Sequence, residues 1–78
     1  MNPRVTNVTP EDNYTLRVWF TNGEMGVFDM KPYLDKGIFR ELKDLAIFNS
    51  VHPDGLSIEW INSASLCPDT VYLDSVKI

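Results

Sequence analysis

Apolar and polar side chains alternate along residues 14–20 and again along residues 24–30, and Asn22-Gly23 lies between the two stretches. Alternation with a period of two is typical of a β-strand that buries one face. Asn-Gly favours a two-residue type I′ turn, because both central residues need a positive φ, which Asn tolerates and Gly adopts freely. The pattern therefore predicts a β-hairpin closed at Asn22-Gly23, onto which the rest of the chain packs.

A two-residue turn determines which residues of the two strands lie opposite each other. It pairs Phe20 with Met25 and Val18 with Val27. Because successive side chains point to opposite faces, the core face is expected to carry Leu16, Val18, Phe20, Met25 and Val27. The other face is expected to carry Arg17, Trp19, Gly26 and Phe28. A slip of one residue would exchange the two faces.

The second of these faces is unusual, because the solvent-facing side of a small sheet is normally polar. Two interpretations of Arg17, Trp19 and Phe28 stay open. In the first, Trp19 covers Gly26 and the Arg17 stem lies on the Phe28 ring, all within one chain. In the second, the side chains form an apolar patch that binds a partner protein or a second copy.

The chain before the hairpin predicts one further strand. Residues 4–9 are rich in β-branched side chains, and Val5 and Val8 fall on opposite faces, which indicates an edge strand or a bulge. Residues 10–13 have the composition of a turn. We therefore expect a three-stranded antiparallel meander, the smallest sheet that holds together on its own.

Helical spacing replaces alternation after the hairpin. In residues 38–45 one apolar stripe, with Phe39 beside it, is formed by Ile38, Leu42 and Leu45. The stretch makes about two turns, which is too short for a stable isolated helix, so it is expected to dock on the sheet. Residues 47–51 add apolar anchors in a second turn.

The chain after these helices predicts one more strand and one more helix. Residues 52–55 have turn composition, and residues 56–60 alternate, with one face formed by Leu56, Ile58 and Trp60. Pro68 favours a helix start, because proline suits the first helical position. Cys67 would be a weak cap for this helix, and the hydrophobic-staple positions around it hold Leu66 and Val71.

Together these elements predict an α+β fold. We expect an antiparallel meander of about three to four strands, with two or three short helices packed on one face. A chain of 78 residues has room for one small core, so a single domain over residues 1–78 is expected.

Composition argues against several classes of protein. The net charge is −4, from 11 acidic and 7 basic residues, and the basic residues are scattered, so direct nucleic-acid binding by the lone chain is not expected. No apolar run approaches the ~20 residues of a membrane span, and no signal peptide is recognisable at the N-terminus. One cysteine allows no internal disulfide. We expect a cytoplasmic protein that does not contact membranes.

Residues that could carry catalysis or bind a metal are few. His52 is the only histidine; a lone His with one distant Cys is no zinc motif, and a surface loop explains it better than a role as base. Cys67 is interpreted as a small buried hydrophobe, with a thiolate at a helix N-terminus as the alternative. Asp29, Asp69 and Asp74 are candidate acids or bases by type only. We therefore predict no enzyme activity, no catalytic residue, no cofactor and no metal.

An ordered string of motifs runs through nearly the whole chain. It comprises Pro3-Arg4-Val5, Tyr14-x-Leu16-x-Val18-x-Phe20-x-Asn22-Gly23-Glu24, Phe28-Asp29, Pro32-Tyr33-Leu34, Gly37-x-Phe39-x-x-Leu42, Phe48, Ile58-x-Trp60 and Leu66-Cys67-Pro68-Asp69-x-x-Tyr72. This string resembles the small bacterial family of unknown function DUF2442. The resemblance implies a compact α+β fold, no established activity, and a second small protein encoded alongside, in arrangements similar to toxin–antitoxin pairs.

One position departs from the pattern of that family. Where such proteins usually have Asp before the Leu66-Cys67-Pro68 segment, this chain has Ser65. If the acid serves a site in the family, that site is in doubt here. If it caps the last helix, Ser65 is expected to accept the same backbone hydrogen bond.

The leading functional hypothesis is a non-catalytic protein-interaction module. It would be an antitoxin-like or accessory partner of a second small protein, or a homo-oligomer, with its contact surface formed by Arg17, Trp19 and Phe28. One alternative is a small ligand-binding domain or enzyme that uses the region of Trp60, Cys67 and Asp69. Another is a DNA-binding regulator that acts only in complex with a basic partner, because phosphate neutralisation would then come from the complex.

Overall fold

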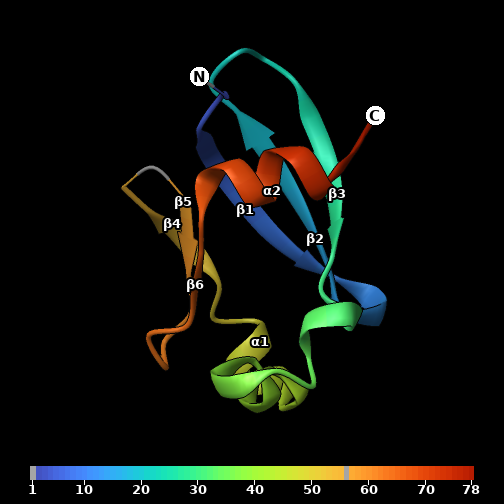
Figure 1. Ribbon diagram of the computed structural model, residues 1–78, viewed down its shortest axis with the longest axis vertical. Helices are drawn as coiled ribbons and strands as arrows, with labels where there is room; N and C mark the ends of the chain where they lie inside the picture. The colour runs from blue at the N-terminus through green and yellow to red at the C-terminus, as the bar shows by residue number, and fades with distance from the viewer. Residues whose placement is uncertain (1, 56) are drawn as a thin grey trace.

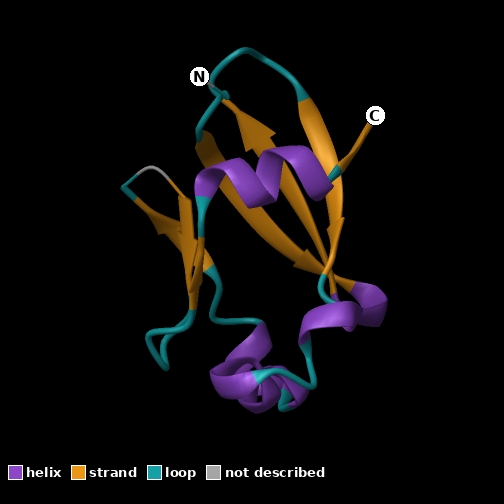
Figure 2. Ribbon diagram, viewed as in Figure 1, coloured by secondary structure: helices purple, strands orange, loops and turns teal. Residues whose placement is uncertain are grey.

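The structure is a computed structural model that describes residues 2–55 and 57–78 (Figures 1 and 2). These residues form two antiparallel sheets, one in the order β1-β2-β3-β7 and one in the order β4-β5-β6. The strands are β1 (Val5–Glu11), β2 (Thr15–Phe20), β3 (Met25–Asp29), β4 (His52–Asp54), β5 (Ser57–Glu59), β6 (Ser65–Leu66) and β7 (Val76–Lys77). The helices are η1 (Asp12–Tyr14), η2 (Lys31–Tyr33) and η3 (Gly37–Lys43), which are 3-10, and α1 (Leu45–Phe48) and α2 (Pro68–Asp74), which are α-helical. The predicted α+β fold is confirmed.

The core lies between the four-stranded sheet and α2. Figure 1 shows α2 crossing one face of that sheet, with the second sheet beside it and α1 at the end away from the β2–β3 turn. Val18 and Phe20 from β2, Ile58 from β5 and Val71 from α2 are all at most 3% exposed. We call this side of the four-stranded sheet the inner face.

The hairpin of β2 and β3 is present, but its turn is one residue longer than predicted. Phe20 N donates to Glu24 O (2.9 Å) and Gly23 N donates to Phe20 O (3.1 Å), so the loop holds the three residues Thr21, Asn22 and Gly23. Gly23 has φ +87°, as a three-residue hairpin loop requires at its left-handed position. The predicted type I′ turn is therefore wrong, and the side chain of Asn22 instead accepts a hydrogen bond from Glu24 N (3.0 Å).

The longer loop moves the pairing by one residue and exchanges the two faces of β3. Trp19 lies opposite Met25 and Arg17 opposite Val27, whereas Gly26 and Phe28 point inward. The assignment of β2 is confirmed, because Leu16, Val18 and Phe20 are buried. The assignment of β3 is wrong, because a side chain in β3 changes face with a slip of one residue.

Strand β1 confirms the expected meander and the expected irregularity. It lies at the edge of the sheet, and its register with β2 shifts between Val5 and Asn7. The strand continues to Glu11, so the predicted turn at residues 10–13 begins later. Two residues of η1, Asn13 and Tyr14, have φ values of +61° and +57°, which is uncommon for Asn and a true outlier for a bulky Tyr.

The helix predicted for residues 38–45 is broken into two pieces. The first is the 3-10 helix η3, and Asp44 (φ −74°, ψ 116°) then starts α1 by accepting a hydrogen bond from Ala46 N (3.0 Å). Leu42 is buried, but Ile38 is 43% and Leu45 is 57% exposed, so the predicted stripe is wrong at both ends. A 3-10 helix has three residues per turn, and the extended residue Asp44 redirects the chain before Leu45.

The predicted fourth strand is β5, and it belongs to the second sheet. Ile58 and Trp60 are each 1% exposed, as expected, whereas Leu56 lies outside the described residues. The turn predicted for residues 52–55 is wrong in its first three residues, because His52–Asp54 pairs with β5 as strand β4. The fourth strand of the first sheet is instead β7, which no pattern in the sequence indicated.

Helix α2 begins at Pro68 as predicted. Cys67 is its N-cap residue and makes no side-chain cap hydrogen bond, and the staple residues Leu66 and Val71 are both buried. Cys67 itself is exposed, so its interpretation as a buried hydrophobe is wrong. Its backbone accepts a hydrogen bond from Val71 N (3.1 Å), which turns the chain into the helix while the thiol stays at the surface.

Candidate functional site

The side of the four-stranded sheet opposite α2 carries a mainly apolar surface. Antiparallel pairing places side chains of neighbouring strands on it in two rows, Thr9, Arg17, Val27, Val76 and Asn7, Trp19, Met25. None of these side chains is classed as buried. We call this surface the outer face and define it by Arg17, Trp19, Met25, Val27 and Val76.

The structure places two of the three predicted contact residues on the outer face. Arg17 and Trp19 lie there, both half-buried. Phe28 does not: it is 0% exposed and stacks on Tyr33 with ring centroids 5.6 Å apart. The prediction that Phe28 contacts a partner is wrong, because the one-residue slip turns it into the core. Met25 and Val27 lie on the outer face instead. In the sequence, only their alternation with Gly26 and Phe28 could have indicated that these two residues share a face.

The interpretation in which the outer aromatic side chains are covered within one chain depends on Gly26 and Phe28, and both of these residues lie on the inner face. Gly26 faces inward, so Trp19 does not cover it, and the Arg17 stem does not lie on Phe28. Arg17 Nε instead donates to Glu11 Oε2 (2.9 Å), and its Nη1 lies 3.9 Å from the sulfur of Met25. These contacts hold the guanidinium along the sheet, although a pair that is about a third exposed on each side stabilises the fold little.

The apolar surface continues past β3 to the edge of the sheet. Val76 lies opposite Val27, and Ile78 N donates to Met25 O (2.9 Å). Val76 is 70% exposed and Ile78 is 63% exposed. Aliphatic side chains this exposed beside half-buried Met25 and Val27 make a continuous apolar patch, which is a mark of interaction sites on small proteins.

An open groove of about 810 Å³ adjoins the outer face at the end where β1 meets η1. It is lined by Pro10, Glu11, Asp12, Asn13, Tyr14, Lys31, Leu45 and Asn49. The phenol of Tyr14 donates to Lys43 O (2.6 Å) and its ring contacts Phe48 edge-on, with ring centroids 5.2 Å apart. These contacts fix the position of the Tyr14 ring in the wall of the groove. No motif in the sequence indicated this groove, because the left-handed residues of η1 build it.

The cation of the groove is already partnered. Lys31 Nζ donates to Asn13 O (3.0 Å) and lies 3.1 Å from Asp29 Oδ1. The backbone N–H of Lys31 also donates to Asp29 Oδ1 (2.9 Å) and, as the largest cause, holds the pKa of Asp29 below its usual value. The carboxylate of Asp29 is therefore ionised and engaged at neutral pH.

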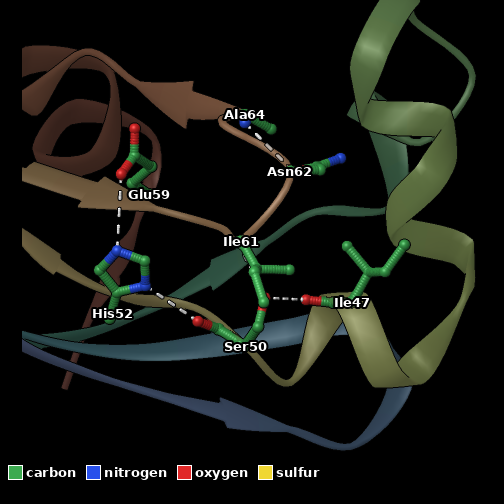
Figure 3. A network of polar contacts seen from close by, with 7 residues as sticks. All are labelled: Ile47, Ser50, His52, Glu59, Ile61, Asn62 and Ala64. Carbon is green, nitrogen blue, oxygen red and sulfur yellow. Dashed lines mark hydrogen bonds and ion pairs between the residues drawn. The ribbon is translucent and has the colours of Figure 1, made fainter.

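His52 is part of a polar network that joins α1 to the second sheet (Figure 3). Its Nε2 lies 3.5 Å from Glu59 Oε1 and its Nδ1 lies 3.0 Å from Ser50 O. The Ser50 hydroxyl donates to Ile47 O (2.5 Å) and accepts from Ile61 N (3.0 Å). The hydroxyl is thus held by backbone groups on both sides, and the network stabilises the packing of α1 against the second sheet.

The residues of the alternative ligand or enzyme site are not brought together. Trp60 is 1% exposed and its Nε1 donates to Phe48 O (3.1 Å), so it lies in the core and lines no groove. Cys67 and Asp69 are exposed, and Asp69 accepts from Asn2 Nδ2 at 3.4 Å. Ser65 is exposed in β6, two residues before Cys67, the N-cap of α2, so of the two alternatives for this position the structure excludes the one in which Ser65 caps the helix.

The described residues contain no group of three or more His, Cys, Asp or Glu side chains placed to hold a metal ion. None of the helices formed by residues 2–55 and 57–78 has the length and apolar character that crossing a bilayer requires.

Comparison with known proteins identifies the family. The model of a family described as "Protein of unknown function (DUF2442)" matches residues 5–76. No curated protein and no solved structure matches the chain. Because the match covers nearly the whole chain, the protein belongs to this family, and the resemblance seen in its motifs is confirmed.

Proposed function

We propose that the chain, as a member of a family of unknown function, is a non-catalytic protein-interaction module that binds its partner through the outer face. The observation that carries this proposal is the burial pattern of β2 and β3. Trp19, Met25 and Val27 lie on the face of the sheet opposite the buried side chains of β2 and β3, and all three are partly exposed, whereas α2 packs on the other face (Figure 2).

The size of the surface suits such a role. A standard protein–protein interface takes about 800 Å² from each partner, roughly a fifth of the 4393 Å² that this chain exposes. Tryptophan and arginine are enriched among residues that dominate binding energy, and Trp19 and Arg17 lie at neighbouring positions near the centre of the outer face.

We infer that the partner is a second small protein, and that the chain serves as an antitoxin-like or accessory component beside it. The support is the resemblance of the family to paired arrangements and the acidic charge of the chain, −4. A pull-down of the tagged protein from its own cells at mild salt, with a nuclease-treated control, tests this. One small stoichiometric protein retained after nuclease is expected. Recovery of the bait only, as a homo-oligomer, would contradict a separate partner.

The surface itself is tested with the double variant Arg17→Ala, Trp19→Ala. We expect a folded protein that loses its partner, because both central side chains are removed. The matched control is Leu73→Ala, since Leu73 is 64% exposed on α2, on the opposite side of the sheet. Retention of the partner by the double variant would rule out the outer face.

A further inference from the structure

The groove beside the outer face is continuous with it through Glu11. Glu11 lines the groove and its carboxylate pairs with Arg17 on the outer face. The last row of the sheet places Glu11, Thr15 and Asp29 side by side, between the apolar rows and the groove. A chain segment that lies along the outer face therefore reaches the groove at its Glu11 end.

The walls of the groove combine apolar surface with a carboxylate that has no partner among the described residues. Leu45 is 57% exposed, and with Pro10 and Tyr14 it provides the apolar part of the lining. The carboxylate of Asp12 makes no hydrogen bond or ion pair with any of residues 2–55 and 57–78. The groove thus offers an aliphatic and aromatic wall that ends at a free negative charge.

The charges around the groove leave one negative charge uncompensated. The charged residues that line the groove are Glu11, Asp12 and Lys31. Counted with the ion-pair partners Arg17 and Asp29, which do not line it, three negative charges stand against two positive ones. Arg17 pairs with Glu11 and Lys31 pairs with Asp29, which leaves Asp12. An anionic ligand is disfavoured, because the nearest cation is already held by Asp29 and by the carbonyl of Asn13.

We infer that the groove receives an arginine or lysine side chain from the protein that binds the outer face. Such a side chain has an aliphatic stem that packs on apolar surface and a cationic head that stays at the rim. The stem lies on Leu45 and Tyr14, and the head pairs with Asp12. Lys31 shows the same chemistry within the chain, since its ammonium is held by a carboxylate and by the carbonyl of the left-handed residue Asn13.

The inference names the chemistry of the partner and rests on the proposed function in that respect. The partner carries an apolar stretch that faces Trp19 and Met25, followed by a basic residue at the Glu11 end. The net charge of −4 steers a basic partner to the chain over longer distances, while Asp12 determines where its cation docks.

The groove is tested without the partner, by following the backbone amide signals of the ¹⁵N-labelled chain during titration with N-acetyl-arginine methylamide. The neutral control ligand is N-acetyl-citrulline methylamide, which keeps the shape and loses the charge. We expect the arginine amide, and not the citrulline amide, to shift the signals of Asn13, Tyr14, Leu45 and Asn49, with a dissociation constant on the order of millimolar. Equal shifts with both ligands, or none, would overturn the inference.

Variants separate the groove from the outer face. Asp12→Asn is expected to weaken arginine-amide binding about fivefold, because it removes the charge and keeps the shape. Asp54→Asn, the same loss of charge on exposed strand β4, and Trp19→Ala should leave that binding unchanged. Unchanged binding in Asp12→Asn would overturn the inference.

The captured partner supplies the second measurement. Retention of this protein at rising salt should fall in Asp12→Asn and stay at the wild-type level in Asp54→Asn. If Asp12→Asn retains the partner fully while Arg17→Ala, Trp19→Ala loses it, the groove inference fails and the proposed function stands. If the double variant retains the partner, the proposed function fails, whatever the titration shows for the groove.

Discussion

The phenol of Tyr72 donates a hydrogen bond of 2.5 Å to Glu24 Oε1, which joins α2 to the β2–β3 turn across 48 positions of the chain. The side-chain amide of Asn22 donates to the same oxygen. Lys77 completes the cluster, because its ammonium lies 4.0 Å from the centre of the Tyr72 ring. The edge-on contact of Tyr72 with Phe20, at 4.9 Å, fixes the helix over the inner face.

This cluster predicts a specific dependence of stability on pH. The Tyr72 phenol, as the largest cause, lowers the pKa of Glu24, so the stabilisation is present above about pH 4.3, the usual glutamate value. It is lost as the pH falls through the lower folded-state pKa. In Tyr72→Phe we expect a smaller free energy of unfolding at pH 6 and a loss of stability towards pH 3 that is less steep than in the wild type. Urea unfolding at both pH values measures this, and equal slopes would contradict it.

At high pH the same hydrogen bond shifts a pKa in the opposite direction. The carboxylate of Glu24 raises the pKa of Tyr72, because it favours the protonated phenol. The stabilisation is therefore complete below the usual tyrosine value of about 10 and is lost as the pH rises through the raised folded-state pKa. Glu24→Gln should bring the pKa of Tyr72, followed by absorbance, back towards that value. Tyr33 is the internal control, because its phenol donates to Asp74 Oδ2 (2.8 Å) and its titration should not change in this variant.

The inward position of Phe28 predicts a large difference between two aromatic residues of the hairpin. Phe28→Leu should lower the free energy of unfolding by about 1–2 kcal/mol, because it leaves a cavity in a site that is 0% exposed. Trp19→Leu, on the outer face, should change it by about 0.5–1 kcal/mol. Urea unfolding followed by circular dichroism compares them. A larger loss of unfolding free energy in Trp19→Leu than in Phe28→Leu would contradict the three-residue loop and support the register of a two-residue turn.

Gly26 predicts how β7 is held against β3. A Cβ at this position would lie 3.1 Å from Ser75 Oγ and 3.2 Å from Val76 O, so Gly26→Ala should destabilise by about 1–3 kcal/mol. It should also increase hydrogen exchange at Ile78 N, whose partner is Met25 O.

Two variants control for this effect. Gly23→Ala has no atom near the added Cβ and only a left-handed φ of +87°, so it should cost about 1–2 kcal/mol without loosening β7. Gly26→Ala combined with Ser75→Gly should recover part of the stability. Unchanged exchange at Ile78 in Gly26→Ala would show that the close approach is relieved at no cost to β7.

The exposure of Cys67 predicts its reactivity. Modification of the folded protein by a thiol reagent at neutral pH should proceed within about fivefold of the rate in denaturant, because no burial protects the thiol. Cys67→Ser should change the free energy of unfolding by less than about 0.5 kcal/mol. Protection of the thiol until unfolding would place it in the core.

Much of the fold could be predicted because its signals are local. Alternation in β2 places Leu16, Val18 and Phe20 in the core whatever the turn does, and Pro68 begins a helix because its fixed φ suits the first helical position. The β-branched residues of β1, with their change of parity, indicate an edge strand or a bulge, and the structure has both, since β1 lies at the edge of the sheet and its register shifts after Val5.

The candidate site could be predicted only in part. Arg17 and Trp19 belong to β2, so the pattern of that strand is enough to place them outward. Phe28 depends on the length of the turn, and one added residue reverses every side chain of β3. The groove depends on the left-handed conformations of Asn13 and Tyr14, which no residue type in η1 favours strongly enough to predict.

The sequence by itself determined the elements whose causes lie within a few residues: the hairpin, the edge strand, the start of α2 and the buried face of β2. Tertiary packing decided the register of β3, because only an inward Phe28 stacks on Tyr33 and only an inward Gly26 admits Ser75. It also decided that Met25 and Val27 face outward with Trp19. The physical reason is that Gly23 is compatible with a two-residue turn and with a three-residue turn. The contacts that β3 makes with η2 and α2 therefore determine which of the two turns forms.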